Sequence, residues 1–190
     1  TDFEPQTTGK PAKEAEIEGK PLPAQMEERE YVKDFQIDTD MEIMFPDEYI
    51  SNISERIRLY KELNEIKTGD ELIKYQQRLT DRFGALPPQA AALLGIVNTK
   101  WLASKLGIEK ILLKNGVLIA YFVSDPNSFF YKTSLFIAIM NYINSHHKNM
   151  SIRQKENRLS LTIRNINSVE EANKVLDTII KETKNRQIVP

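Results

Sequence analysis

Few residues of this 190-residue chain have the types and spacing that catalysis needs. The absence of cysteine excludes a thiolate nucleophile, a disulfide framework and a metal bound by thiolates. The chain also lacks the G-x-x-x-x-G-K-S/T and G-x-G-x-x-G patterns, whose backbone amides hold nucleotide phosphates. We therefore expect that this chain is not an enzyme by itself, holds no cofactor, and neither binds nor hydrolyses ATP.

Two histidines and a small group of carboxylates are the remaining candidates for a metal or acid–base site. His146 and His147 are adjacent at the end of a predicted helix, where neighbouring side chains diverge by about 100° and rarely share a metal. Glu65, Asp70 and Glu71 lie near the predicted junction of two helices. A polar helix end and a solvated, capped junction are the simpler interpretations, so the sequence predicts no metal site.

A charged helix face is the strongest candidate for a binding site. The residues from Thr68 to Glu71 form a capping-box pattern, which predicts a helix that continues to Phe83. Helical spacing turns an apolar stripe toward the core: Leu72, Tyr75, Leu79 and Phe83. The outward face consists of charged candidates for a protein contact: Glu71, Lys74, Arg78, Asp81 and Arg82. Such a face on a rigid helix suits a reversible contact, although a solvated surface remains the alternative.

Basic residues late in the chain suggest a different function. They are Lys132, Lys148, Arg153, Lys155, Arg158 and Arg164. Binding to nucleic-acid phosphates requires such groups on one face. The formal net charge of the chain is −1, and acidic residues interleave with the basic ones, so no global basic excess supports this function. A nucleic-acid-binding module therefore stands as the second hypothesis, and a small stand-alone enzyme as the third.

Periodicity predicts the helices that must position these residues. One helix begins at Ser51 or Ser54 and ends at Ile66, with Ile53 and Ile57 among its inward residues. A broadly apolar helix from Gln89 to Gly107, containing Trp101, is expected to be the buried central helix. A fourth helix is expected over residues 129–145, and a last one follows the cap at Ser168.

Two β-hairpins are predicted in the second half of the chain. Asn115-Gly116 separates two runs of β-branched and aromatic residues, which is a strong hairpin signal. A second hairpin is expected over residues 150–155 and 158–164. The fold class is therefore α+β, with a helical N-terminal half followed by two hairpins, four antiparallel strands in all, that alternate with helices on one face.

The composition divides the chain into a tail and one domain. Residues 1–30 are rich in Pro, Lys, Glu and Gln, which predicts a linker or flexible tail, and residues 31–190 are expected to form a single domain. Residues 31–46 alternate apolar and polar side chains and are expected to form an extended strand. No apolar run is long enough to span a membrane and no signal peptide opens the chain, so we expect a cytoplasmic protein.

Four short segments resemble a known family. They are Phe45-Pro-Asp-Glu-Tyr-Ile50, Arg56-Ile-Arg-Leu-Tyr60, Leu79-Thr-Asp-Arg-Phe-Gly84 with Pro87, and Leu106-Gly-Ile108. Within this order of helices they are similar to the C-terminal domain of the bacterial transcription-repair coupling factor. The resemblance covers about residues 34–180.

The resemblance implies a function that the composition does not show. The family's full protein is an ATP-driven DNA translocase that displaces stalled RNA polymerase and recruits excision repair through UvrA. Its C-terminal domain is not catalytic and masks the UvrA-binding module near the N-terminus of the same chain. Acidic residues of the helix that ends in Asp-Arg-Phe-Gly make that contact. Asp81 matches one of them, whereas the commonly acidic position three residues earlier is Arg78 here.

Overall fold

The computed structural model describes residues 30–187, so all but the last residue of the predicted tail, residues 1–30, lies outside the described part of the chain. The elements follow in this order: β1 (Gln36–Thr39), α1 (Ile53–Glu65), α2 (Gly69–Phe83), α3 (Pro88–Lys105), β2 (Ile108–Lys114), β3 (Val117–Phe122), the 3₁₀ helix η2 (Phe129–Lys132), α4 (Ser134–Ser145), β4 (Met150–Lys155), β5 (Arg158–Arg164) and α5 (Val169–Gln187). The predicted α+β class, with helices first and two hairpins that alternate with helices, is confirmed.

Local sequence signals fix both ends of α2. The Thr68 hydroxyl accepts a hydrogen bond from the Glu71 backbone N–H at 3.2 Å, and the Glu71 carboxylate accepts one from the Thr68 N–H at 3.2 Å. This reciprocal pair satisfies N–H groups that have no partner inside the helix. Gly84 ends the helix with φ at +87°, and Pro88 occupies the first turn of α3.

The sheet contains one strand more than the hairpins supply. Its order is β1-β2-β3-β5-β4, with antiparallel pairing everywhere except between β1 and β2, which are parallel. The predicted strand over residues 31–46 is therefore reduced to β1, and the sheet is mixed. Pairing of Ile37 with Ile111 places both apolar side chains on the inner face, which explains the position of β1 beside β2.

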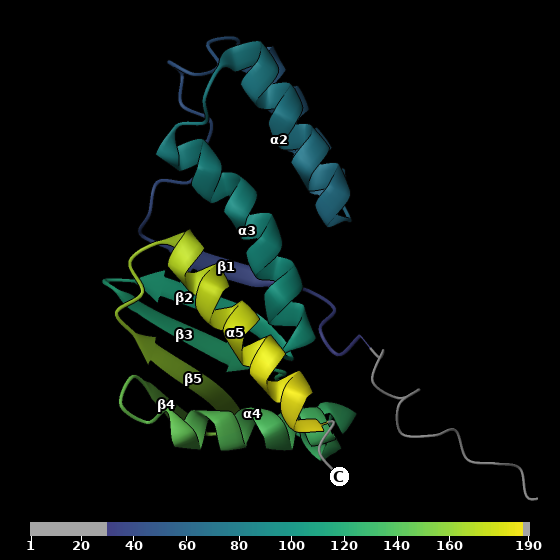
Figure 1. The fold of residues 1–190 in the computed structure, drawn as a ribbon, viewed down its shortest axis with the longest axis vertical. Helices are drawn as coiled ribbons and strands as arrows, with labels where there is room; N and C mark the ends of the chain where they lie inside the picture. The colour runs from purple at the N-terminus through teal and green to yellow at the C-terminus, as the bar shows by residue number, and fades with distance from the viewer. Residues whose placement is uncertain (1–29, 188–190) are drawn as a thin grey trace, which may run out of the picture.

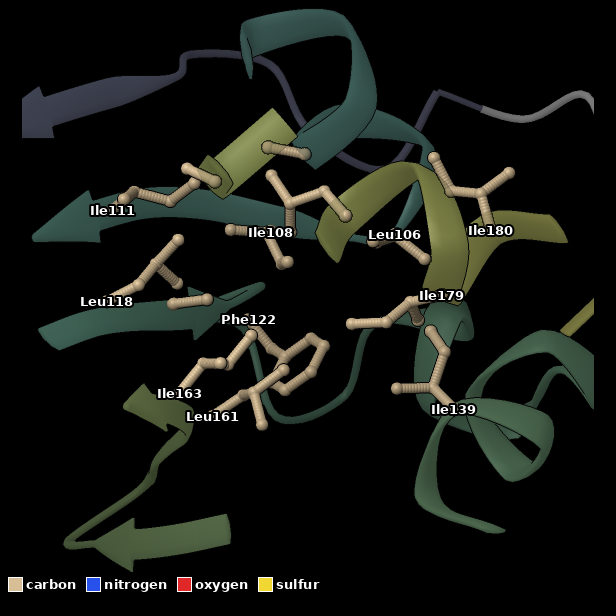
Figure 2. Close-up of a cluster of buried hydrophobic side chains, with 14 of the residues drawn as sticks. Leu106, Ile108, Ile111, Leu118, Phe122, Ile139, Leu161, Ile163, Ile179 and Ile180 are labelled. Atoms are coloured by element: carbon tan, nitrogen blue, oxygen red, sulfur yellow. The ribbon is translucent and has the colours of Figure 1, made fainter. Parts of the chain in front are cut away.

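Helices cover one face of the sheet. Figure 1 shows α3 and α5 across this face, with α4 beside α5. Alternate strand residues point toward the helices, so that Leu118, Phe122 and Leu161 meet Ile139 and Ile179 in the main core (Figure 2). The opposite face of the sheet carries no helix from the described residues.

A second, smaller core holds α1 and α2. The α3 helix joins the two cores, because Ala90 and Leu94 belong to the smaller one and Ala103 to the main one. Thr99 is completely buried where α3 meets α5, and its hydroxyl donates a hydrogen bond to the Asn173 side chain at 2.6 Å. The predicted central role of this helix is confirmed by these contacts.

The structure corrects several details of the predicted packing. Trp101 is only half-buried, because it packs at the edge of the smaller core and lines a surface groove. The side chains of Ile53 and Ile57 are exposed, at 65% and 50%, because only one side of α1 faces the smaller core. The helix expected over residues 129–145 is two helices, because Thr133 is extended and its hydroxyl accepts a hydrogen bond from the Phe136 N–H, which starts α4.

Candidate functional site

The orientation of α2 is fixed by its contact with α1. Leu72, Tyr75 and Leu79 are buried, and the Tyr75 hydroxyl donates a hydrogen bond to the Leu59 carbonyl oxygen at 2.7 Å. Burial raises the pKa of Tyr75 well above its usual value, so the hydroxyl keeps the proton that it donates. The outward face of α2 is therefore presented on a rigid support.

An ion-pair network joins α1 to one side of α2. Arg82 lies 2.5 Å from Glu55, and Arg78 pairs with Glu62. Arg58 lies between the two carboxylates, 2.7 Å from Glu55 and 3.5 Å from Glu62. Arg78 and Arg82, two of the predicted contact residues, thus pair with α1 while their side chains stay more than half exposed.

All five predicted contact residues are exposed, and they differ in whether their side chains already have partners. Glu71 belongs to the helix cap, where its carboxylate also accepts a hydrogen bond from the Lys67 N–H at 2.8 Å. Within residues 30–187, neither Lys74 nor Asp81 has an ion pair or a side-chain hydrogen bond, and both are exposed. Lys74 and Asp81 are therefore the two candidates whose charges are not already paired among the described residues.

A continuous face of α2 surrounds these two residues. At 3.6 residues per turn, positions 70, 73, 74, 77 and 81 fall within an arc of about 100°. We call this arc the free face of α2; its residues are Asp70, Ile73, Lys74, Gln77 and Asp81, and all are exposed. Ile73, at one edge of this arc, is 56% exposed, so a partner that covered the face would bury apolar surface.

Ile73 was missing from the residues selected by sequence. Its signal was present, because a large apolar side chain occurs on the outward side of a helix whose inward stripe is already complete. A single exposed apolar side chain is common on protein surfaces, so Ile73 adds apolar area to the face and does not by itself mark a contact site.

A groove between α1 and α2 borders the free face. Its volume is about 390 Å³, and Asp81 lies at its rim with Arg58, Glu62, Arg78 and Arg82. Its apolar lining comes from Leu59, Tyr75, Leu79 and Phe83. A cationic side chain of a partner could reach Asp81 here without disturbing the pairs between α1 and α2.

The ion-pair network predicts a pH dependence of stability. A hydrogen bond from Arg58, helped by the charges of Arg58 and Arg82, lowers the pKa of Glu55 below its usual value of 4.5. A depressed folded-state pKa contributes stability above pH 4.5 that is lost as the pH falls through the folded value. Urea unfolding at pH 7, 5 and 3 should therefore show a smaller acid loss in Glu55→Gln than in wild type.

The control for this measurement is Glu65→Gln. Glu65 is exposed on the same helix and has no ion pair among the described residues. Its substitution should leave the wild-type acid loss unchanged. An equal acid loss in Glu55→Gln and wild type would show that the network does not contribute to stability.

The two histidines lie at the end of α4 and belong to no metal-binding cluster of the described residues. The His146 ring stacks on Tyr142 with centroids 4.0 Å apart, and its Nδ1 lies 2.8 Å from the Tyr142 carbonyl oxygen. Among residues 30–187, no three His, Asp or Glu side chains are grouped so that they could hold a metal. No helix in this part of the chain has the length and apolar character that a membrane span requires.

The late basic residues separate into two groups. Arg153, Lys155, Arg158 and Arg164 lie on β4 and β5, on the face of the sheet that the helices leave open. Lys132 lies in η2 and Lys148 in the turn after α4, so neither belongs to that face. The cluster predicted from sequence is therefore only partly brought together.

Comparison with known proteins agrees with this architecture. The family model described as the TRCF domain matches residues 39–133. The transcription-repair-coupling factor of Escherichia coli (strain K12) is 37% identical over 76 residues, which cover 40% of this chain and 7% of that protein. The transcription-repair-coupling factor of Staphylococcus aureus (strain USA300) is 34% identical over 87 residues, 46% of this chain and again 7% of the relative.

A solved structure supports the fold beyond the matched sequence. The crystal structure of the C-terminal domain of a transcription-repair coupling factor superposes with a TM-score of 0.63 at 18% identity, covering 80% of this chain and 96% of that one. The sequence matches to the two curated relatives, by contrast, each cover only 7% of the relative's length. Because the TRCF model spans half of the chain and includes all of α2, this chain belongs to the TRCF domain family, the C-terminal domain of transcription-repair coupling factors.

Proposed function

We propose that this domain is a non-catalytic regulatory domain that masks the UvrA-binding module of its own parent protein in the resting state. Its direct partner is that N-terminal module, and UvrA and RNA polymerase act on the contact indirectly. The parent is an ATP-dependent DNA translocase of transcription-coupled repair in the bacterial cytoplasm. Its motor lies outside this chain, which covers about 7% of its relatives' length.

The observation that carries this proposal is the free face of α2. Asp81 lies at the position where the family resemblance expects an acidic contact, and it has no partner among the described residues. Arg78 stands at the second position and is already paired with Glu62. The contact of this protein therefore relies on Asp81, Lys74 and the apolar surface of Ile73, in place of two acidic residues.

The composition of the free face suits a reversible mask. A contact that must open when polymerase binds requires a coupling free energy of about 1–3 kcal/mol. An exposed ion pair contributes about 0.2–1 kcal/mol, so Asp81 cannot supply this alone. Ile73, which is 56% exposed, adds burial of apolar surface in the same contact.

The test is a titration of UvrA against the full-length parent protein without RNA polymerase. Asp81→Arg reverses one of the three charges of the face and should raise the apparent affinity for UvrA about five- to tenfold, since a single charge reversal removes only part of the coupling. Ile73→Ser should act in the same direction. Both side chains are exposed, so the melting temperature of the domain should change by no more than a few degrees.

Glu182→Arg is the matched control. It makes the same change of charge at an exposed site on α5 that does not line the groove shared by α2 and the first half of α5. This variant should bind UvrA as wild type does. Unchanged UvrA affinity in folded Asp81→Arg and Ile73→Ser proteins would show that the masking surface is not the free face of α2.

A further inference from the structure

The face of the sheet opposite the helices, which we call the open face, carries charged residues that are mostly basic. The five strands contain six basic residues, Lys110, Lys114, Arg153, Lys155, Arg158 and Arg164, and two acidic residues, Asp38 and Glu109. The strand register places all six cations on the face opposite the helices. This concentration is local, because the formal net charge of the whole chain is −1.

The two carboxylates of the strands are already neutralised. Asp38 lies 2.8 Å from Lys114, and Glu109 lies 2.9 Å from Arg158. The other four cations, Lys110, Arg153, Lys155 and Arg164, have no ion pair among the described residues. The open face therefore has uncompensated positive charge spread over β2, β4 and β5.

An aromatic side chain lies at the centre of this charge. Tyr121 is half-buried on β3, between Lys110 of β2 and Ser160 of β5 in the register. The Arg158 guanidinium lies over its ring, 5.3 Å from the centroid, and is also paired with Glu109. Apolar side chains of Leu112 and Ile119 form the half-buried neighbouring row.

We propose that this open face binds single-stranded nucleic acid. Such binding has two requirements: cations that can reach the phosphates of the nucleic acid, and a planar platform on which its bases can stack. The four unpaired cations supply the first, and the stack of Tyr121 and Arg158 with the apolar row beside it supplies the second. This site is separate from the free face of α2, which belongs to the smaller core.

The shape of the face favours a single strand over a duplex. Five strands about 4.8 Å apart make a platform roughly 20 Å wide, on which unstacked bases can lie. A duplex is read by an element that enters its groove, and a sheet face without a protruding helix offers none.

Acidic residues limit the path at one end of the face. A groove of about 710 Å³ beside β2 contains Lys110 and Arg158 but also Glu30, Asp34 and Asp125. These carboxylates repel phosphates, so the single-stranded nucleic acid should not enter this groove. The path of the nucleic acid therefore crosses the face from Tyr121 to Arg153 and toward Arg164, with Lys110 at its edge beside the groove.

The experiment is a fluorescence-anisotropy titration of the 190-residue chain with labelled dT20, U20 and a 20-base-pair duplex at 50–200 mM salt. We expect dT20 or U20 to bind more tightly than the duplex, and the affinity to fall with salt with a logarithmic slope of about −2 to −3. Arg153→Glu combined with Arg164→Glu should weaken single-strand binding at least about tenfold and reduce the slope by about 1.4. Tyr121→Leu should weaken it about fivefold or more through lost stacking.

The matched control is Lys61→Glu combined with Lys100→Glu. Both lysines are exposed on helices and have no ion pair among the described residues. Because two basic residues are again replaced by glutamate, this variant has the same net charge as the sheet variant. It should retain affinity within about twofold, and all variants should melt near the wild-type temperature. Any of four results would overturn the proposal. They are an equal loss of affinity in the two double variants, tighter binding of the duplex than of the single strands, displacement by polyglutamate as effective as by dT20, and no binding at 50 mM salt.

Discussion

Phe130→Ala should lower the free energy of unfolding by about 3–5 kcal/mol, the range for truncation of a fully buried aromatic residue. The Phe130 side chain is completely buried in η2. Its ring centroid lies 5.5 Å from those of Tyr31 and Phe136, 5.3 Å from that of Tyr131 and 6.0 Å from that of Phe122. Its removal would leave a cavity where η2, β3, α4 and the segment before β1 meet.

Urea unfolding followed by circular dichroism measures this loss. Phe129→Ala is the control, because the neighbouring Phe129 side chain is 38% exposed and should cost about 1 kcal/mol or less. A loss below about 1 kcal/mol in Phe130→Ala would mean that η2 does not anchor the main core.

Much of the fold was predictable because its signals are local. The capping box at Thr68 and the glycine at 84 fix α2 within a few residues of sequence. Both hairpins have nearly the predicted bounds, since a turn and its flanking strands are neighbours in the chain. The parallel pairing of β1 with β2 was not predictable in this way, because it joins residues more than 70 positions apart.

The candidate site shows the same limit. Periodicity correctly placed Lys74 and Asp81 on the outside of α2. It could not show that Arg78 and Arg82 face α1, because their partners lie 16 and 27 residues earlier and depend on how the two helices pack. A residue on the outward side of a helix is therefore exposed, but its side chain can still be paired with a neighbouring helix that the sequence pattern does not reveal.

The basic face of the sheet was recognised only in part. Sequence order grouped Arg153 and Arg164 with Lys132 and Lys148, which the structure places elsewhere. The group selected from the sequence did not include Lys110, which precedes Arg153 by about 40 residues. The antiparallel pairing of β3 with both β2 and β5 brings these distant residues onto one surface, and that pairing is a property of the tertiary fold.

Gly107→Ala should lower the free energy of unfolding by about 2–5 kcal/mol for two separate reasons. Gly107 has φ at +68°, a conformation that costs an L-residue about 1–2 kcal/mol. A Cβ added there would lie 2.4 Å from Cε2 and Cζ of Phe130, and overpacking of a well-filled core costs about 1–3 kcal/mol more. Urea unfolding of the single variant gives the sum of the two contributions.

A double-mutant cycle with Phe130→Ala separates the two contributions. When the Phe130 ring is absent, the new methyl group has no ring to displace, and only the conformational cost of about 1–2 kcal/mol should remain. The double variant should therefore be more stable than the sum of the single losses predicts, by about 1–3 kcal/mol. Gly84→Ala is the matched control, since Gly84 also has positive φ but no atom within 4 Å of an added Cβ.

The control cycle of Gly84→Ala with Phe130→Ala should be additive within about 0.5 kcal/mol, because Gly84 is exposed at the end of α2 whereas Phe130 is buried in the main core. Additivity in the Gly107 cycle as well would mean that the Phe130 ring does not lie against the turn between α3 and β2. In that case the cost of Gly107→Ala would be conformational alone. The requirement for glycine at this turn would then come from the backbone, and the aromatic cluster would place no limit on the residue at position 107.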